Sequence, residues 1–173
     1  IWYIAGADGL PVEESARKNI PIVKAIIDEA HKHNLKVAVH ATERITAQLS
    51  VENGADFLVH SVDYEILKPD FIQLMKKNKT ILCPTLVVVR NYGTSLGQNM
   101  EFDLKKKEKS DAFQLGSLAD LRHISDATLV NRYKNNKQSK KSEEKWLSPK
   151  KSMLANLKLL SDAGVTIVTG TDA

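Results

Sequence analysis

The sequence contains one cysteine, Cys83, and this scarcity excludes two kinds of site. A single thiol cannot form a disulfide within the chain, and it cannot build a zinc site made of several cysteines. The sequence also lacks any apolar run near the roughly 18 residues of a membrane span, and it has no basic segment followed by an apolar one at its start. We therefore expect no membrane partner. The cytoplasm is the default compartment, although the sequence leaves export open.

The excess of positive charge is confined to one part of the chain. The net charge is +4, but residues 90–150 carry 13 Lys and Arg against 8 Asp and Glu, while the remainder carries 12 against 13. A local excess of this kind is not the basic surface of a nucleic-acid-binding protein. We therefore expect a small-molecule substrate and no nucleic acid, and the sequence leaves the oligomeric state open.

The 173 residues, 42% of them hydrophobic and 27% charged, suit one globular domain. Short apolar runs bounded by turn residues predict buried parallel strands, and apolar residues at helical spacing predict amphipathic helices. The predicted strands are 1–4, 36–41, 57–61, 81–86 and 165–169. The predicted helices are 21–33 with Pro21 in the first turn, 43–52 capped by Thr42, 67–78, one over 118–129, and one beginning at Ser148–Pro149 and closed by Gly164.

Strands and helices alternate along the chain, which implies parallel strands joined by right-handed crossovers. Either a doubly wound sheet or a β/α barrel satisfies this pattern, and five strands are fewer than the eight of a complete barrel. Because the chain begins and ends inside predicted strands, we expect it to be a piece of a longer chain. Residues 90–148 form a long, basic and partly helical insertion between the last two strands.

Three residues that can bind a metal stand at the ends of apolar runs. His40 and His60 end two consecutive predicted strands, and Asp172 follows the last one. The carboxyl ends of parallel strands meet at one edge of a sheet, where ligands and catalytic groups gather. Imidazole and carboxylate are common zinc ligands. By contrast, His31 and His33 fall at the end of a predicted helix, where a histidine needs no functional explanation.

The segments around these residues resemble a known family. Val37–Ala41, Phe57–Ser61, Ile81–Leu86 and Val168–Ala173 look like strands five to eight of the metal-dependent amidohydrolase superfamily, nearest to its imidazolonepropionase-like branch, which includes Xaa-Pro dipeptidases. The resemblance implies an α/β fold, namely a partial (β/α)8 TIM-type barrel with strands four to eight and a long insertion after strand seven. Residues 1–173 would then be a fragment of one hydrolase barrel domain.

The resemblance also implies a chemistry. His40 and His60 would bind one divalent ion, and Asp172 would bind another and move the proton. The expected cofactor is zinc, as one or two ions. A metal-activated hydroxide would hydrolyse a carbon–nitrogen bond in an amide, a cyclic amide or a dipeptide. The family's His-x-His pair and its lysine ligand have no counterpart here, so we expect the fragment alone to be inactive.

The insertion at 90–148 follows the strand-seven segment, at the catalytic mouth of such a barrel. One hypothesis makes it a lid whose Arg90 or Tyr92 meets an anionic group on the substrate. The alternative is a solvated excursion without contact to a ligand. Two alternatives to the hydrolase also stay open: a β/α enzyme that uses His40 and His60 as acid and base without metal, and an inactive half-barrel.

Overall fold

The computed structural model describes residues 1–63, 65–88, 94–98, 108–120, 125–136 and 140–170, without the side chains of 118–120, 135–136 and 140–149. The chain forms two compact units. One contains Ile1–Leu86 with Ser148–Ala173, and the other contains Val87–Leu147.

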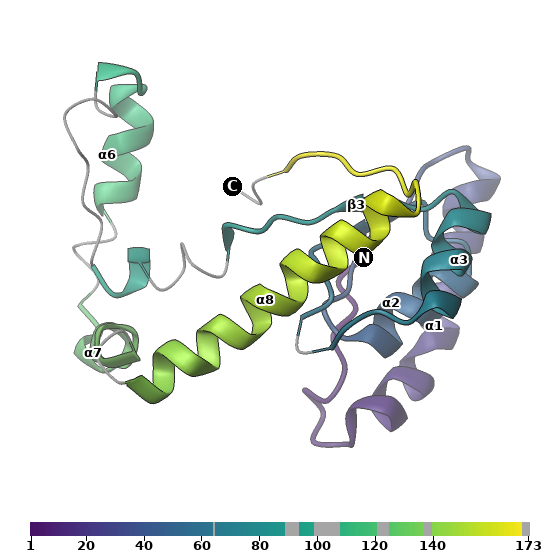
Figure 1. The fold of residues 1–173 in the computed structure, drawn as a ribbon, viewed down its shortest axis with the longest axis horizontal. Coiled ribbons are helices and arrows are strands. Elements are labelled where there is room, and N and C mark those ends of the chain that lie inside the picture. The colour runs from purple at the N-terminus through teal and green to yellow at the C-terminus, as the bar shows by residue number, and fades with distance from the viewer. Residues whose placement is uncertain (64, 89–93, 99–107, 121–124, 137–139, 171–173) are drawn as a thin grey trace. The chain divides into compact units, whose positions relative to one another are not determined.

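The first unit contains three short parallel strands (Figure 1): β1 (Ala38–His40), β2 (Phe57–Val59) and β3 (Ile81–Cys83), in the order β1-β2-β3. A parallel bridge joins Trp2 to His40 on one side, and another joins Leu82 to Ile167 on the other. The predicted strands at 1–4 and 165–169 are therefore present only as single bridges. The prediction of an α/β fold with parallel strands is confirmed, and the partial (β/α)8 barrel with strands four to eight stays a prediction.

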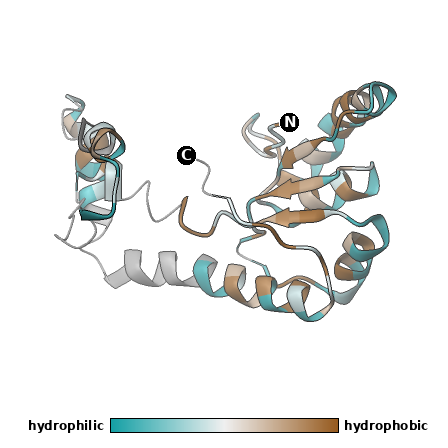
Figure 2. Cartoon of the chain, turned by 90° about the horizontal axis from the view of Figure 1, so that it is seen from above, coloured by the Kyte–Doolittle hydropathy of each residue, from teal (hydrophilic) through white to brown (hydrophobic). Residues whose placement is uncertain are grey.

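The two faces of this sheet differ. The central residues of the three strands, Val39, Leu58 and Leu82, are 0%, 2% and 3% exposed, because they point into a core shared with the helices. Their neighbours in each strand are half-buried or exposed. The strands appear brown, and therefore hydrophobic, in Figure 2. An apolar sheet covered by helices on one face thus presents half-exposed apolar groups on the other.

Helix α1 (Val12–Lys32) is longer than predicted, and Pro21 lies inside it rather than in its first turn. Proline lacks the N–H that would bond to the carbonyl of Arg17, so the helix loses one hydrogen bond there. Tertiary contacts stabilise the earlier turns. The Tyr3 hydroxyl donates to the Ala16 carbonyl at 2.6 Å, and both residues are buried.

Helix α2 (Arg44–Glu52) begins one residue later than a Thr42 cap requires. Its N-cap is Glu43, so the prediction of Thr42 as the capping residue is wrong. The helix ends as predicted, because Gly54 adopts a left-handed φ of 94° after it, a conformation that glycine takes at little cost.

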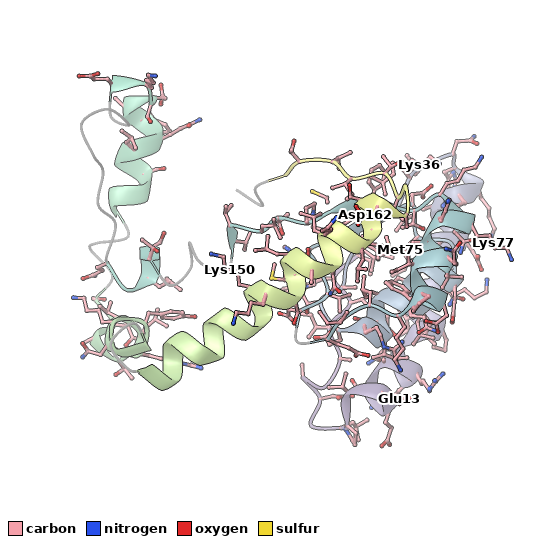
Figure 3. The ribbon with its side chains drawn as sticks, viewed as in Figure 1. Glu13, Lys36, Met75, Lys77, Lys150 and Asp162 are labelled. Atoms are coloured by element: carbon pink, nitrogen blue, oxygen red, sulfur yellow. The ribbon has the colours of Figure 1, made fainter. Side chains whose placement is uncertain are left out.

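Helix α3 (Pro69–Asn78) begins with its proline in the first turn, where the missing N–H would have had no helical partner. Figure 3 shows Met75 on the side of α3 toward α8 and Lys77 on the outer side. Met75 is 1% exposed. The amphipathic pattern that predicted this helix therefore also predicted its buried face.

Helix α8 (Lys140–Asp162) begins well before the predicted start at Ser148–Pro149 and runs through both residues. A proline removes one backbone hydrogen bond from a helix but need not end it. The residues just before Ser148 include the good helix formers Lys, Glu and Leu. As predicted, α8 closes at Gly164, which has a φ of 77°.

The second unit contains α6 (Ala112–Asp120) and α7 (Ala127–Asn136), so the single helix predicted over 118–129 is wrong. Asp126 explains the start of α7, because its carboxylate accepts hydrogen bonds from the N–H groups of Thr128 and Leu129 at 2.9 and 3.0 Å. Such N-cap bonds define a helix start. Within the described residues, no helix is both long and apolar enough to cross a membrane.

Candidate metal centre

His40 and His60 lie together at the carboxyl edge of the sheet. His40 is the last residue of β1, and His60 directly follows β2, whose Val59 pairs with His40. Their ring centroids are 4.3 Å apart and the rings meet edge to face at 75°. The structure therefore brings together two of the three residues that the sequence singled out.

A left-handed turn orients His60. Side chains two residues apart in a strand lie on the same face, so His60 would lie with Leu58 on the helix-covered face. The positive φ of His60, 74°, instead turns its ring toward His40. Its Nδ1 is hydrogen-bonded to Oγ1 of Thr85 at 2.5 Å, and Thr85 also has a positive φ, 41°. Such conformations cost roughly 1–3 kcal/mol each and gather at functional sites.

Sequence reasoning missed Thr85 as a site residue. The signal that could have found it is Pro84, which ends β3 because proline cannot donate to a strand ladder. The residue that follows such a break leaves the sheet at its carboxyl edge. Metal-ligating histidines usually have their second ring nitrogen hydrogen-bonded, and Thr85 has that relation to His60.

The first segment of the chain holds His40 in place. Its backbone N–H donates to the Ile1 carbonyl at 2.8 Å, and its carbonyl accepts from the Tyr3 N–H at 3.1 Å. The indole of Trp2 meets the His40 ring with centroids 5.7 Å apart. Trp2 is 76% exposed, so its large aromatic side chain is accessible to solvent beside the histidine pair. Sequence reasoning did not single it out.

The other predicted site residues, Asp172, Arg90 and Tyr92, lie outside the described residues. The chain leading to Asp172 is described as far as Gly170. A Cβ added at Gly170 would lie 2.3 Å from Sγ of Cys83, the last residue of β3. Gly170 therefore passes against the carboxyl end of β3, where a larger residue would require the Cys83 thiol to shift.

The histidine pair suits a divalent cation. Zinc binds imidazole nitrogens at about 2.0–2.1 Å, and two rings with centroids 4.3 Å apart can direct one nitrogen each to a shared ion. Within the described part of the chain, no group of three His, Cys, Asp or Glu side chains could hold a metal. Two candidate ligands are therefore described, and metal binding stays a prediction.

Two carboxylates follow the histidines at the same spacing, Glu43 three residues after His40 and Asp63 three residues after His60. Burial and the nearby charge of Glu43 raise the pKa of Asp63 to about 6. Glu43 accepts hydrogen bonds from the hydroxyls of Thr42 and Thr46 at 3.2 and 2.9 Å. Asp63 thus holds its proton more tightly than an ordinary aspartate, and the equal spacing could have identified it.

The opposite end of the sheet holds a different cluster. Asp56 accepts hydrogen bonds from Lys36 at 2.7 Å and from the Val37 N–H at 2.9 Å, and its carboxylate lies 2.9 Å from Nε2 of His31. Burial would raise the pKa of Asp56, but these donors outweigh it and lower the pKa to about 2. His31 therefore has a side-chain partner beyond its helix end, while His33 contacts Glu29 of the same helix at 3.2 Å.

A broad apolar groove of about 710 Å³ runs along α1. Its lining residues are Pro21, Ile22, Ala25, Ile26, Glu29, Ala30, His33 and Leu35. None of them belongs to the histidine pair or its neighbours, so this groove is separate from the candidate metal centre.

No family model and no curated protein matches this chain. The solved structures that are similar to it include the following two. One, described as a Xaa-Pro dipeptidase with bound methionine in the active site, has 20% sequence identity and a TM-score of 0.48, over 87% of this chain and 28% of that one. The other, an A. niger ochratoxinase, has 21% identity and a TM-score of 0.48, over 87% of this chain and 25% of that one. The chain spans about a quarter of the length of either protein.

Proposed function

We propose that this chain is part of a metal-dependent hydrolase that acts on carbon–nitrogen bonds in a small amide, a cyclic amide or a dipeptide. The observation that carries the proposal is the His40–His60 pair, two imidazoles with centroids 4.3 Å apart at the carboxyl edge of parallel strands. The hydrogen bond from His60 to Thr85 supports it, because ligating histidines are oriented in this way.

The same proposal makes the sheet a segment of a (β/α)8 barrel, strands four to eight. Its support is the order of the strands. Each one pairs with the next along the chain, from the bridge at Trp2 through β1, β2 and β3 to the bridge at Ile167. A doubly wound sheet reverses its strand order at a switch point, and this order contains no reversal over the described strands. The half-exposed apolar face of the sheet would then be the barrel interior.

In this proposal His40 and His60 hold one divalent cation, expected to be zinc, and Asp172 supplies a carboxylate for the same centre or for a second ion. When bound, such an ion acidifies a water molecule and polarises the carbonyl under attack. Asp172 would accept a proton as general base and deliver it to the departing nitrogen as general acid. Thr85 would keep the His60 ring in its ligating orientation.

The region 90–148 would cover this centre as a lid. Its Arg90 or Tyr92 would meet an anionic group on the substrate, since a guanidinium or a phenol hydroxyl suits a carboxylate. The partner would be a small molecule rather than a nucleic acid or a membrane. Replacing Arg90 by Ala is expected to raise KM, and an unchanged KM would remove Arg90 from the proposal.

Zinc binding provides the direct test. The affinity of the protein for zinc, measured by competition with a chromophoric chelator, is expected to fall roughly 100-fold or more in His60→Asn, because removing a ligand costs more than the 10–100-fold seen for outer-shell partners. The matched control is His33→Asn, which removes an exposed imidazole on α1 and should leave the affinity unchanged.

Activity provides the second test. The complete protein is expected to lose amide or dipeptide hydrolysis when a chelator removes the metal and to regain it with added zinc. The proposal would be contradicted if His60→Asn and His33→Asn had the same zinc affinity, or if the metal-free protein were fully active. The second result would favour the alternative in which His40 and His60 act as acid and base.

A further inference from the structure

Asn156, on α8, is a buried polar residue that the proposed chemistry does not use. It is 1% exposed. Its Nδ2 donates to the carbonyls of Val62 and Glu65 at 3.0 and 2.8 Å, and its Oδ1 accepts from the N–H of Leu67 at 2.8 Å. One amide thus satisfies three backbone groups of a segment far earlier in the sequence.

Those three groups belong to the segment that directly follows His60. Among the described residues 61–63 and 65–67, this segment has two backbone–backbone hydrogen bonds, from the Asp63 N–H to the Thr42 carbonyl at 3.3 Å and from the Glu65 N–H to the Asp63 carbonyl at 2.6 Å. Asn156 therefore supplies much of the hydrogen bonding that fixes the path of the chain after His60.

Asn156 also lies behind the histidine itself. A cavity of about 10 Å³ is lined by His60, Ser61, Leu67 and Asn156 together with apolar residues of β2, β3, α3 and α8. The Ser61 hydroxyl is buried and has no hydrogen-bond partner among the described residues. Closely packed side chains pass a shift in one of them on to their neighbours. Because Asn156 and His60 line the same small cavity, a shift at Asn156 reaches the backbone of His60.

We propose that Asn156 is a positioning residue for the candidate metal centre. It keeps the segment after His60 in the path that requires the left-handed φ of 74°, and thereby holds the His60 ring against His40 and Thr85. This inference rests on the proposed function only where it concerns zinc. The orientation of His60 is a property of the chain with or without a metal.

Asparagine is suited to this role because the site needs two donors and one acceptor from a single side chain. Asn156→Asp has the same shape but places a carboxylate, which only accepts, against the carbonyls of Val62 and Glu65. Asn156→Ser keeps a small hydroxyl that can donate and accept hydrogen bonds. It is the variant to test if Asn156→Asp does not fold. The matched control is Thr80→Val, which removes a buried hydrogen bond of 3.1 Å to the Ala55 carbonyl at the other end of the sheet.

The experiment follows the histidine rings by NMR in protein labelled at histidine nitrogen, and measures zinc affinity by chelator competition in the same variants. We expect Asn156→Asp and Asn156→Ser to move the His60 ring resonances and its titration midpoint, and to weaken zinc binding about 10-fold or more, as loss of outer-shell support does. Thr80→Val should also destabilise the fold, by the loss of one buried hydrogen bond, and leave the His60 signals and the zinc affinity unchanged.

Folded Asn156 variants with wild-type His60 resonances would overturn the positioning role. The same conclusion would follow if Thr80→Val shifted the His60 signals as strongly, because the effect would then be one of general stability. A wild-type protein that bound no zinc would overturn the proposed function alone, and the ring resonances would still decide the role of Asn156.

Discussion

The two ends of the parallel sheet both hold histidine side chains and an aspartate, but the aspartates have opposite properties. At the amino end, donors around Asp56 lower its pKa to about 2, although burial opposes them. At the carboxyl end, burial and the charge of Glu43 raise the pKa of Asp63 to about 6. A carboxylate surrounded by donors stabilises the fold. A carboxylate desolvated beside another is a cost to the fold, and such groups gather at functional sites.

Among the substitutions that test this comparison, the largest effect is expected for the replacement of Asp172. In the complete protein, Asp172→Asn should lower kcat by roughly 10²–10⁴-fold, because a positioned general base contributes about that much, while zinc binding by His40 and His60 persists. Steady-state kinetics and a zinc titration measure the two effects. The control is Asp162→Asn at the end of α8, where the carboxylate pairs with Lys158 at 2.8 Å. Equal kcat in both variants would remove Asp172 from the mechanism.

A smaller effect is expected at Gly170, where the chain approaches β3. Gly170→Ala places a Cβ 2.3 Å from Sγ of Cys83, and overpacking of this kind costs about 1–3 kcal/mol of stability. Adding Cys83→Ala removes the sulfur and should restore part of the loss, as a double-mutant cycle from urea unfolding would show. Additive effects would mean that the two residues are not in contact. Gly9→Ala does not serve as a control, because Gly9 has a positive φ of 81°.

At the amino end, Asp56→Asn should lower the free energy of unfolding at pH 7 by about 2 kcal/mol, since a pKa depressed from 3.8 to about 2 corresponds to that much linkage energy. The folded pKa is below the unfolded one, so this stability is present above pH 4 and is lost as the pH falls toward 2. Urea unfolding across this range measures it. Asp28→Asn, at an exposed pair with Lys24, is the control and should change little.

The smallest effect has the opposite sign. The folded pKa of Asp63 lies above the unfolded value, about 6 against 3.8, so the native state loses stability as the pH rises from 4 to 6. Asp63→Asn removes this loss. A shift of about two pKa units corresponds to about 3 kcal/mol, and solvent screening of this half-buried carboxylate reduces the expected gain to about 1–2 kcal/mol at pH 7, with the gain absent below pH 4. If Asp63→Asn instead destabilised the protein at pH 7, the two ends of the sheet would not differ in the way described.

Much of the first unit could be predicted from local pattern. The apolar runs ending at His40 and His60 predicted β1 and β2, and Gly164 marked the end of α8 correctly. The predictions were wrong where tertiary contacts outweighed the local preference of a residue. Pro21 indicated a helix start but lies inside α1, because the buried contact of Tyr3 with the preceding turns stabilises them.

The candidate site was predictable in part for the same reason. Residues at strand ends are visible in the sequence, since strand ends coincide with the ends of apolar runs. The roles of Thr85 and Asn156 could not be predicted from the sequence. Each acts through a hydrogen bond to a residue distant in the chain, His60 in one case and the segment 62–67 in the other, and side-chain periodicity carries no information about such pairs.

The sequence by itself determined the alternation of strands and helices, the parallel direction of the strands and the placement of His40 and His60 at one edge, because all three follow from the period of the apolar residues. Only the tertiary structure decided that the His60 ring turns to meet His40, that Thr85 orients it and that Asn156 fixes the chain behind it. Those features depend on a left-handed backbone angle and on contacts between distant segments, which form only when the helices have packed onto the sheet.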